Sequence, residues 1–256
     1  MIISHKHRYI FIEMPHTAST GISRELCQHY DGEPILHKHA HYYEFLKLAS
    51  PVEKTYFSFA GIRNPLDIAV TLFFKYKTNH QNFYTDQKYL QINGGHVSSQ
   101  ELREFHFITD NNASFSDYLL KFYRLPYDSW GSPRPHQFDF IIRYEYLQKD
   151  FAHLLHLLNI KQNRPLPTVN KTDQKPENFW SYYSPETYQQ VQFVFGAYMK
   201  IWNYKTPISW GDFQITQLNY LTFKLLEMLR KNLVWGSNIY ANLFRKLRNA
   251  FPDFLP

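Results

Sequence analysis

The amino-acid sequence predicts an α/β fold in which a mostly parallel sheet is flanked by helices, with a helical extension at the carboxyl end. Two observations carry this prediction. Strand-like and helix-like segments alternate through the first 160 residues, and two of the strands run directly into a turn that begins a helix. Such alternation favours a parallel sheet that is covered on both faces and binds its ligand at the carboxyl ends of the strands. The 256 residues suffice for one such domain with additions.

Hydrophobic runs and apolar periodicity place the elements of the first 160 residues. In chain order they are a strand at 9–14, a helix through Ile22 and Leu26, a strand at 33–37, a helix at 42–48, a strand at 55–62, a helix from Pro65, a helix at 116–123, a strand at 138–142 and a helix over 147–158. Proline is favoured at the first position of a helix, which supports the start at Pro65.

Residues 77–112 are polar and irregular, and we expect them to form a long loop that covers or shapes a site. The aromatic side chains in this segment are candidates for lining that site. They include Tyr84, Tyr89, Phe105 and Phe107.

Beyond residue 160 the sequence changes character. Residues 161–180 are rich in proline and asparagine and are expected to be a loop, after which Ser184-Pro185-Glu186 caps a helix that ends near Trp202. We therefore divide the chain into an α/β domain at 1–205 and a helical extension at 206–256.

The extension contains two amphipathic helical stretches, at 218–229 and 239–247, and carries several basic residues. Three arrangements stay open for it. The helices could pack on the main domain or on a second subunit, lie on a membrane surface as a basic amphipathic tail, or bind another partner.

The bulk composition limits the class of protein. A net charge of +6 fits a polyanionic ligand or partner, and it equally fits a mildly basic protein. The single cysteine, Cys27, cannot form an intramolecular disulfide and is expected in the core. No run approaches the roughly 20 apolar residues of a membrane span, and residues 1–8 are too short and polar for a signal peptide. A cytoplasmic location is therefore expected.

The first turn, residues 15–21, consists of small and hydroxyl residues between a strand and a helix. Such a turn directs backbone N–H groups inward, and the helix adds the positive end of its dipole. The natural ligand is a phosphate or a sulfate ester. The turn is not the phosphate-binding loop of a kinase, because the Gly-x4-Gly-Lys-Ser/Thr pattern is missing.

A second turn with anion-binding chemistry begins at Arg63, at the end of the third expected strand. Arginine offers a planar fork for a phosphate group. Thr71, eight residues further on in the helix, could add a hydroxyl to the same anion. Two such turns predict a ligand with charged groups at both ends.

The two turns together resemble the motifs of the sulfotransferase family, and most closely its carbohydrate-type branch. Residues 15–21 resemble the Pro-Lys-Thr-x-Ser/Thr-Thr-Ser loop, and residues 63–71 resemble the Arg-Asn/Asp-Pro-x-Asp-(3 residues)-Ser motif. Further similar segments follow in the expected order at 56–60, 138–147, 150–151, 169–172, 182–184 and 202–204. The resemblance covers about residues 8 to 205.

This resemblance implies a P-loop-like sheet and transfer of a sulfuryl group from 3′-phosphoadenosine 5′-phosphosulfate (PAPS) to a hydroxyl, with no metal requirement. The acceptor is expected to be a carbohydrate, and the product of the donor is adenosine 3′,5′-bisphosphate (PAP). The implied donor contacts are Thr17, Ala18, Ser19, Thr20 and Gly21 at the 5′-phosphosulfate, Arg63 and Thr71 at the 3′-phosphate, and Lys171 at a donor phosphate. For Lys171 a solvated loop lysine is the alternative.

Three histidines are candidates for catalysis. His16 stands where the family loop has a lysine, and it would assist the bridging oxygen as it leaves. Of the cluster at 37–41, the resemblance implies His39 as the first choice and His37 as the second for the base that takes the acceptor proton. Exposed loop histidines are one alternative for the cluster, and a metal site is another, because alternate residues of an extended segment share a face.

Two rival functions stay open. The departure at His16 is compatible with a catalytically impaired relative that binds PAP, PAPS or a carbohydrate without transfer. A nucleic-acid-binding protein would use a basic, aromatic surface and bind with a steep salt dependence, but no recognition motif supports it.

Overall fold

The computed structural model describes residues 1–90, 95–127, 137–169, 171–211, 213 and 215–229. The chain packs into two compact units. The first unit contains Met1–Asn64 and Ser129–Lys171, and the second contains Pro65–Asp128 and Thr172–Pro256. The boundary at residue 205 divides the chain differently and stays a prediction.

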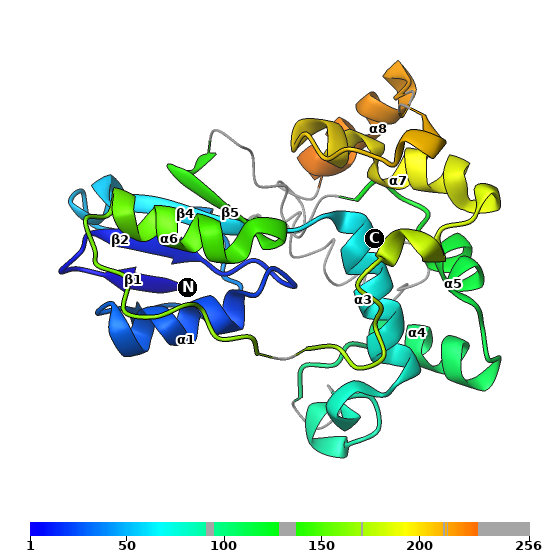
Figure 1. The fold of residues 1–256 in the computed structure, drawn as a ribbon, viewed down its shortest axis with the longest axis horizontal. Coiled ribbons are helices and arrows are strands. Elements are labelled where there is room, and N and C mark those ends of the chain that lie inside the picture. The colour runs from blue at the N-terminus through cyan, green and yellow to red at the C-terminus, as the bar shows by residue number, and fades with distance from the viewer. Residues whose placement is uncertain (91–94, 128–136, 170, 212, 214, 230–256) are drawn as a thin grey trace. The chain divides into compact units, whose positions relative to one another are not determined.

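A five-stranded sheet forms the centre of the first unit (Figure 1). Its spatial order is β3-β1-β2-β4-β5. The strands are β1 at Ile2–Ser4, β2 at Tyr9–Ile12, β3 at Glu33–Pro34, β4 at Phe57–Ile62 and β5 at Phe140–Arg143. Strands β2, β4 and β5 are parallel to one another, whereas β1 runs antiparallel to both β2 and β3. The mostly parallel α/β sheet predicted from the sequence is thus confirmed, with an antiparallel edge.

The antiparallel strand β1 was not expected, because residues 1–8 were interpreted only as a short polar segment. Its three residues are too few to show a period of two. They are nevertheless buried, and they pair with β2 in the register Ile2–Phe11 and Ile3–Ile10.

Both faces of the sheet are covered, which explains why β2 is apolar at every position. Successive side chains of a strand point to opposite faces. On one face, Phe11 and Phe59 pack with residues of α1 (Ser19–His29) and α6 (Leu147–Leu157). On the other face, Ile10 and Ile12 pack with Phe45 of α2 (Tyr42–Leu48). Figure 1 shows α1 in blue and α6 in green beside this sheet.

The second unit is helical in its described part. Its α-helices are α3 at Pro65–Lys77, α4 at Ser99–Asp110, α5 at Phe115–Phe122, α7 at Tyr188–Ile201 and α8 at Gln217–Leu229. An aromatic core holds them together, in which Phe73, Tyr118 and Phe195 are almost completely buried. The helices expected from Pro65, at 116–123 and through 188–202 are therefore present, as is the helix at 218–229. The helix expected at 239–247 lies outside the described residues.

The loop expected over 77–112 was wrong in its second half, where α4 forms. A capping box at Ser98 marks the start of α4. The Ser98 hydroxyl accepts from the N–H of Glu101, and the Glu101 carboxylate accepts from the N–H of Ser98. The polar composition concealed this start. Tyr84 and Phe105 are buried in the aromatic core, where they stack on each other.

Replacing the cap of α4 tests this correction. We expect Ser98→Ala to lower the free energy of unfolding by about 1 kcal/mol, because the N–H of Glu101 loses its hydroxyl acceptor. The thermal midpoint should then fall by about 2–4 °C. Ser99→Ala, one residue further on and exposed, is the matched control and should leave the midpoint within about 1 °C. Equal effects of the two substitutions would contradict the cap.

Candidate active site

The carboxyl ends of β2, β4 and β5 meet at one edge of the sheet in the first unit. Parallel pairing places Ile12 opposite Ala60, and Ile62 opposite Arg143. The segments that leave these three strands are the turn before α1, the Arg63-Asn64 pair and the Tyr144-Glu145 pair. Ligands of parallel sheets bind at this edge.

The turn between β2 and α1 has an unusual backbone conformation. His16 and Ala18 both have φ of 63°, in the left-handed region, whereas Thr17 between them does not. This alternation turns successive N–H groups toward one side and forms a concave anion-binding nest. The Thr17 hydroxyl donates to the Met14 carbonyl over 2.9 Å and fixes the turn from beneath. Non-glycine residues in this region cost free energy and concentrate at functional sites.

Helix α1 adds its amino terminus to this nest. Ala18 is its N-cap, and the Ala18 carbonyl accepts from the N–H groups of Gly21 and Ile22 at 2.9 and 3.1 Å. The first N–H groups of a helix have no acceptor within the helix, so those of Ser19 and Thr20 remain for a ligand. The first turn carries no acidic side chain. The sequence-predicted residues 17–21 therefore lie together around one positively polarised turn.

Arg63 connects the three strand ends. Its Nη1 donates to the His16 carbonyl over 3.2 Å, and its guanidinium carbon lies 3.9 Å from the centre of the Tyr144 ring. The next N–H, that of Asn64, donates to the Glu145 carboxylate over 2.6 Å. Arg63 is buried at 6% exposure, so these contacts hold its planar group in one orientation.

A glycine in β4 allows the turn to approach this closely. A Cβ at Gly61 would lie 2.7 Å from the Thr17 hydroxyl oxygen and 3.0 Å from its Cβ. Any larger residue would push the turn away from the strand. Gly61 was not singled out from the sequence, where it appears only as a small residue inside a hydrophobic strand.

His39 lies beside the end of β2. Its Nδ1 is 2.7 Å from the Glu13 carbonyl oxygen. Because a carbonyl only accepts, Nδ1 carries the hydrogen, and the neutral ring therefore has its lone pair on Nε2. Burial lowers the pKa of the His39 imidazole, the bond to Glu13 opposes this shift, and the charge of Lys38 adds to it. The neutral form that can accept a proton is thus favoured at neutral pH.

The other histidines differ from His39 in their surroundings. His41 is the N-cap of α2 and shares a capping box with Glu44, so its role is structural. His37 and His16 are exposed. Within the described part of the chain, no three side chains of His, Cys, Asp or Glu gather into a group that could hold a metal ion.

Lys38 is the residue of this site that the sequence interpretation passed over. Its Nζ donates to the Thr20 hydroxyl over 2.9 Å, although the two residues are 18 positions apart. The signal available in the sequence was its position between the two candidate histidines. Nothing in the pattern of the chain could pair it with α1.

The structure shows where two of the predicted donor contacts, Thr71 and Lys171, lie in the fold. Thr71 belongs to the second unit, is buried in α3, and donates its hydroxyl to the Asp67 carbonyl over 2.7 Å within the helix. Lys171, at the end of the first unit, is exposed. Their roles at the donor stay predictions.

A pocket of about 460 Å³ opens next to the anion-binding turn, within the first unit. Its walls come from three segments. They are Ala18 with Gly21 and Ile22 of α1, residues 144–149 after β5, and residues 166–169. The pocket thus shares Ala18 with the turn and Tyr144 with the Arg63 stack.

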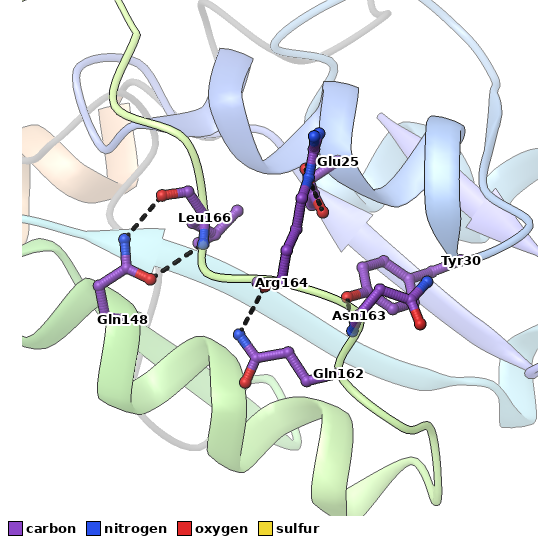
Figure 2. A network of polar contacts seen from close by, with 7 residues as sticks. All are labelled: Glu25, Tyr30, Gln148, Gln162, Asn163, Arg164 and Leu166. Atoms are coloured by element: carbon purple, nitrogen blue, oxygen red, sulfur yellow. Dashed lines mark hydrogen bonds and ion pairs between the residues drawn. The ribbon is translucent and has the colours of Figure 1, made fainter.

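A polar network holds the third wall of this pocket in place (Figure 2). Arg164 binds the fully buried Glu25 of α1 through two nitrogens, at 2.8 and 3.1 Å. The Gln148 amide both donates to and accepts from the Leu166 backbone, at 2.8 and 2.9 Å. Residues 162–166, expected only as loop, therefore bridge α1 and α6 in fixed contacts.

A parallel sheet whose strand ends carry a helix-terminal anion nest and a fixed arginine defines an α/β protein that binds phosphorylated or sulfated ligands. Residues 1–205 match the profile of the sulfotransferase family, and the chain belongs to that family. The family resemblance seen in the sequence is thereby confirmed. Membership indicates transfer of a sulfuryl group to a hydroxyl-bearing acceptor as the class of reaction. Comparison with curated proteins and with solved structures gave no match.

No helix among the described residues is long and apolar enough to cross a membrane.

The close approach of Gly61 and Thr17 can be tested by a double-mutant cycle. We expect Gly61→Ala to lower the free energy of unfolding by about 1–3 kcal/mol, because its methyl group overlaps the Thr17 side chain. Thr17→Ala alone should cost about 1 kcal/mol through loss of the bond to Met14. In the double variant the cost should be smaller than the sum, since the shortest overlap is relieved. Strict additivity in urea denaturation would show that the two residues do not touch.

Proposed function

We propose that this protein is a PAPS-dependent sulfotransferase that transfers the sulfuryl group to a hydroxyl, with a carbohydrate as the acceptor class. The observation that carries the proposal is the fixed orientation of Arg63 beside the amino terminus of α1. Two anion-binding groups at one sheet edge suit a donor with charge at both ends. Membership of the family supplies the reaction class.

In this proposal the turn at 17–21 binds the 5′-phosphosulfate. Its N–H groups and hydroxyls can donate hydrogen bonds to an anion, and the first turn of α1 carries no acidic side chain that would repel one. Arg63 binds the 3′-phosphate, and the pocket beside Ala18 and Tyr144 takes the nucleoside. Thr71 and Lys171 are further candidates at the donor phosphates. The family's phosphosulfate donor supplies the activated sulfuryl group, and the protein positions it and neutralises its charge.

His39 is the proposed base, with His37 as the second candidate. The Glu13 carbonyl fixes the tautomer of His39, so that Nε2 is free to accept the acceptor's proton. His16 is proposed to assist the leaving oxygen. Its exposed side chain lies in the strained turn, where the family loop would have a lysine.

The second candidate function is a relative that binds PAP or a carbohydrate without transfer. The observation that favours it is His16 itself, because it stands where the family loop has a lysine, the residue type that carries a permanent charge at neutral pH.

Donor binding is the first test. We expect PAP to bind more tightly than 5′-ADP in calorimetry, because only PAP carries the 3′-phosphate. Arg63→Ala should weaken PAP binding on the order of 10²-fold, as a charge-assisted fork is worth roughly 3 kcal/mol. Arg8→Ala is the matched control, since Arg8 also stacks on a tyrosine, Tyr56, but stands before β2 at the opposite sheet edge. Equal affinity for PAP and 5′-ADP would contradict the proposal.

Turnover tests the base. We expect His39→Ala to retain PAP affinity and to lower kcat by a factor on the order of 10²–10⁴. In the unchanged protein, kcat should fall on the acid side as the pH drops through the lowered pKa of His39, because protonation removes the base. An unchanged kcat in His39→Ala would assign the base elsewhere, and His37→Ala would then be measured in the same assay.

A further inference from the structure

We propose that Lys38 is a donor-contacting residue whose ammonium group neutralises the 5′-phosphosulfate at the first turn of α1. The inference rests on the proposed function and adds a residue that the family resemblance did not assign. It gives this site a permanent side-chain cation, which residues 15–21 themselves do not contain.

The first observation is the position of the ammonium group. Nζ of Lys38 donates to the hydroxyl of Thr20, the second residue of α1, over 2.9 Å. An ammonium group has three donors. Among the described residues, the Thr20 hydroxyl is its one hydrogen-bond acceptor, which leaves two donors for a ligand. A phosphosulfate has several oxygens that can accept them.

The second observation is electrostatic. The amino end of a helix carries about half a positive charge, so a lysine placed there is repelled in the absence of an anion. The Glu13 carboxylate, whose charge interacts with that of Lys38, is already bonded to the amino terminus of Met1 and to the Ser23 hydroxyl. An anion bound between the N–H groups of α1 and the ammonium of Lys38 would turn this repulsion into two attractions. The position of Lys38 beside the amino end of α1 is therefore suited to a turn that holds an anion.

The third observation is that the segment around Lys38 is held in place on both sides. His39 is bonded to the Glu13 carbonyl, Ala40 is buried and donates to the His37 carbonyl, and His41 caps α2. The Lys38 backbone is thus anchored by its neighbours, and its side chain spans the remaining distance to α1. The cation and the proposed base are consecutive residues of one segment.

This placement gives Lys38 a defined part in the transfer. The acceptor oxygen forms a bond to sulfur as its proton passes to Nε2 of His39. The bond between sulfur and the bridging oxygen breaks, and its electron pair stays on that oxygen, which becomes part of the 5′-phosphate of PAP. Lys38 faces the charge that develops there.

Two nucleotides that differ only at the 5′ end test the inference by binding alone. We expect Lys38→Met to weaken the binding of PAP about 10-fold to 100-fold, because a charged hydrogen bond is lost. The affinity for adenosine 3′-monophosphate, which has no 5′-phosphate, should not change. Lys38→Arg should restore most of the PAP affinity. Lys54→Met, an exposed lysine in the turn before β4 at the opposite sheet edge, is the matched control and should change neither affinity.

A charge-rescue experiment follows in the same background. His16→Lys should recover the PAP affinity and the kcat of Lys38→Met, whereas it should add little when Lys38 is present, because one cation then already serves the turn.

The outcomes separate the two proposals. Should the unchanged protein fail to prefer PAP over 5′-ADP, the proposed function and this inference fall together. Should it prefer PAP while Lys38→Met binds PAP as before, the donor site stands and Lys38 is only a solvated lysine. Equal weakening of PAP and adenosine 3′-monophosphate would also contradict the inference, because it would place the effect away from the 5′ end.

Discussion

The stacking of Arg63 between the His16 carbonyl and the Tyr144 ring is the interaction on which the rest of the site depends. It joins the segments that leave β2, β4 and β5, so a change in any one strand end reaches the other two. The close contact of Gly61 with Thr17 and the bond between Asn64 and Glu145 act in the same place. Together they fix a strained turn and a buried guanidinium without using a ligand to hold them.

The arrangement also explains the division of charge around the proposed donor. Backbone N–H groups of α1 and the guanidinium of Arg63 supply fixed positive polarity, because neither can lose a proton at neutral pH. His39 is kept neutral by burial, which a proton acceptor requires. Lys38 and His39 are adjacent in sequence, yet one contacts α1 and the other contacts the end of β2. A single segment thereby presents a cation, which must stay protonated, and a base, which must stay neutral.

The parts of the fold with strong local signals were predictable from the sequence. The buried runs of β2, β4 and β5 and the proline at the start of α3 could be recognised because burial on both faces and helix starts leave a local pattern. Strand β1 is too short to show a pattern, and α4 is marked only by its Ser98–Glu101 capping box within a polar segment. At the site, residues 16–21, Arg63 and His39 were identified as candidates. The contact of Lys38 with Thr20 and the wall formed by residues 166–169 were missed, since both depend on tertiary packing between distant segments.

The proposed position of the donor is at the carboxyl ends of β2, β4 and β5. Amide chemical shifts of the ¹⁵N-labelled protein, followed during titration with PAP, test it most directly. We expect the largest changes at Thr17–Gly21, at Arg63 and Asn64, and in the pocket walls at 144–149 and 166–169. Changes confined to the pocket between α7 and α8, which is lined by Ala197, Ile215 and Tyr220, would contradict it.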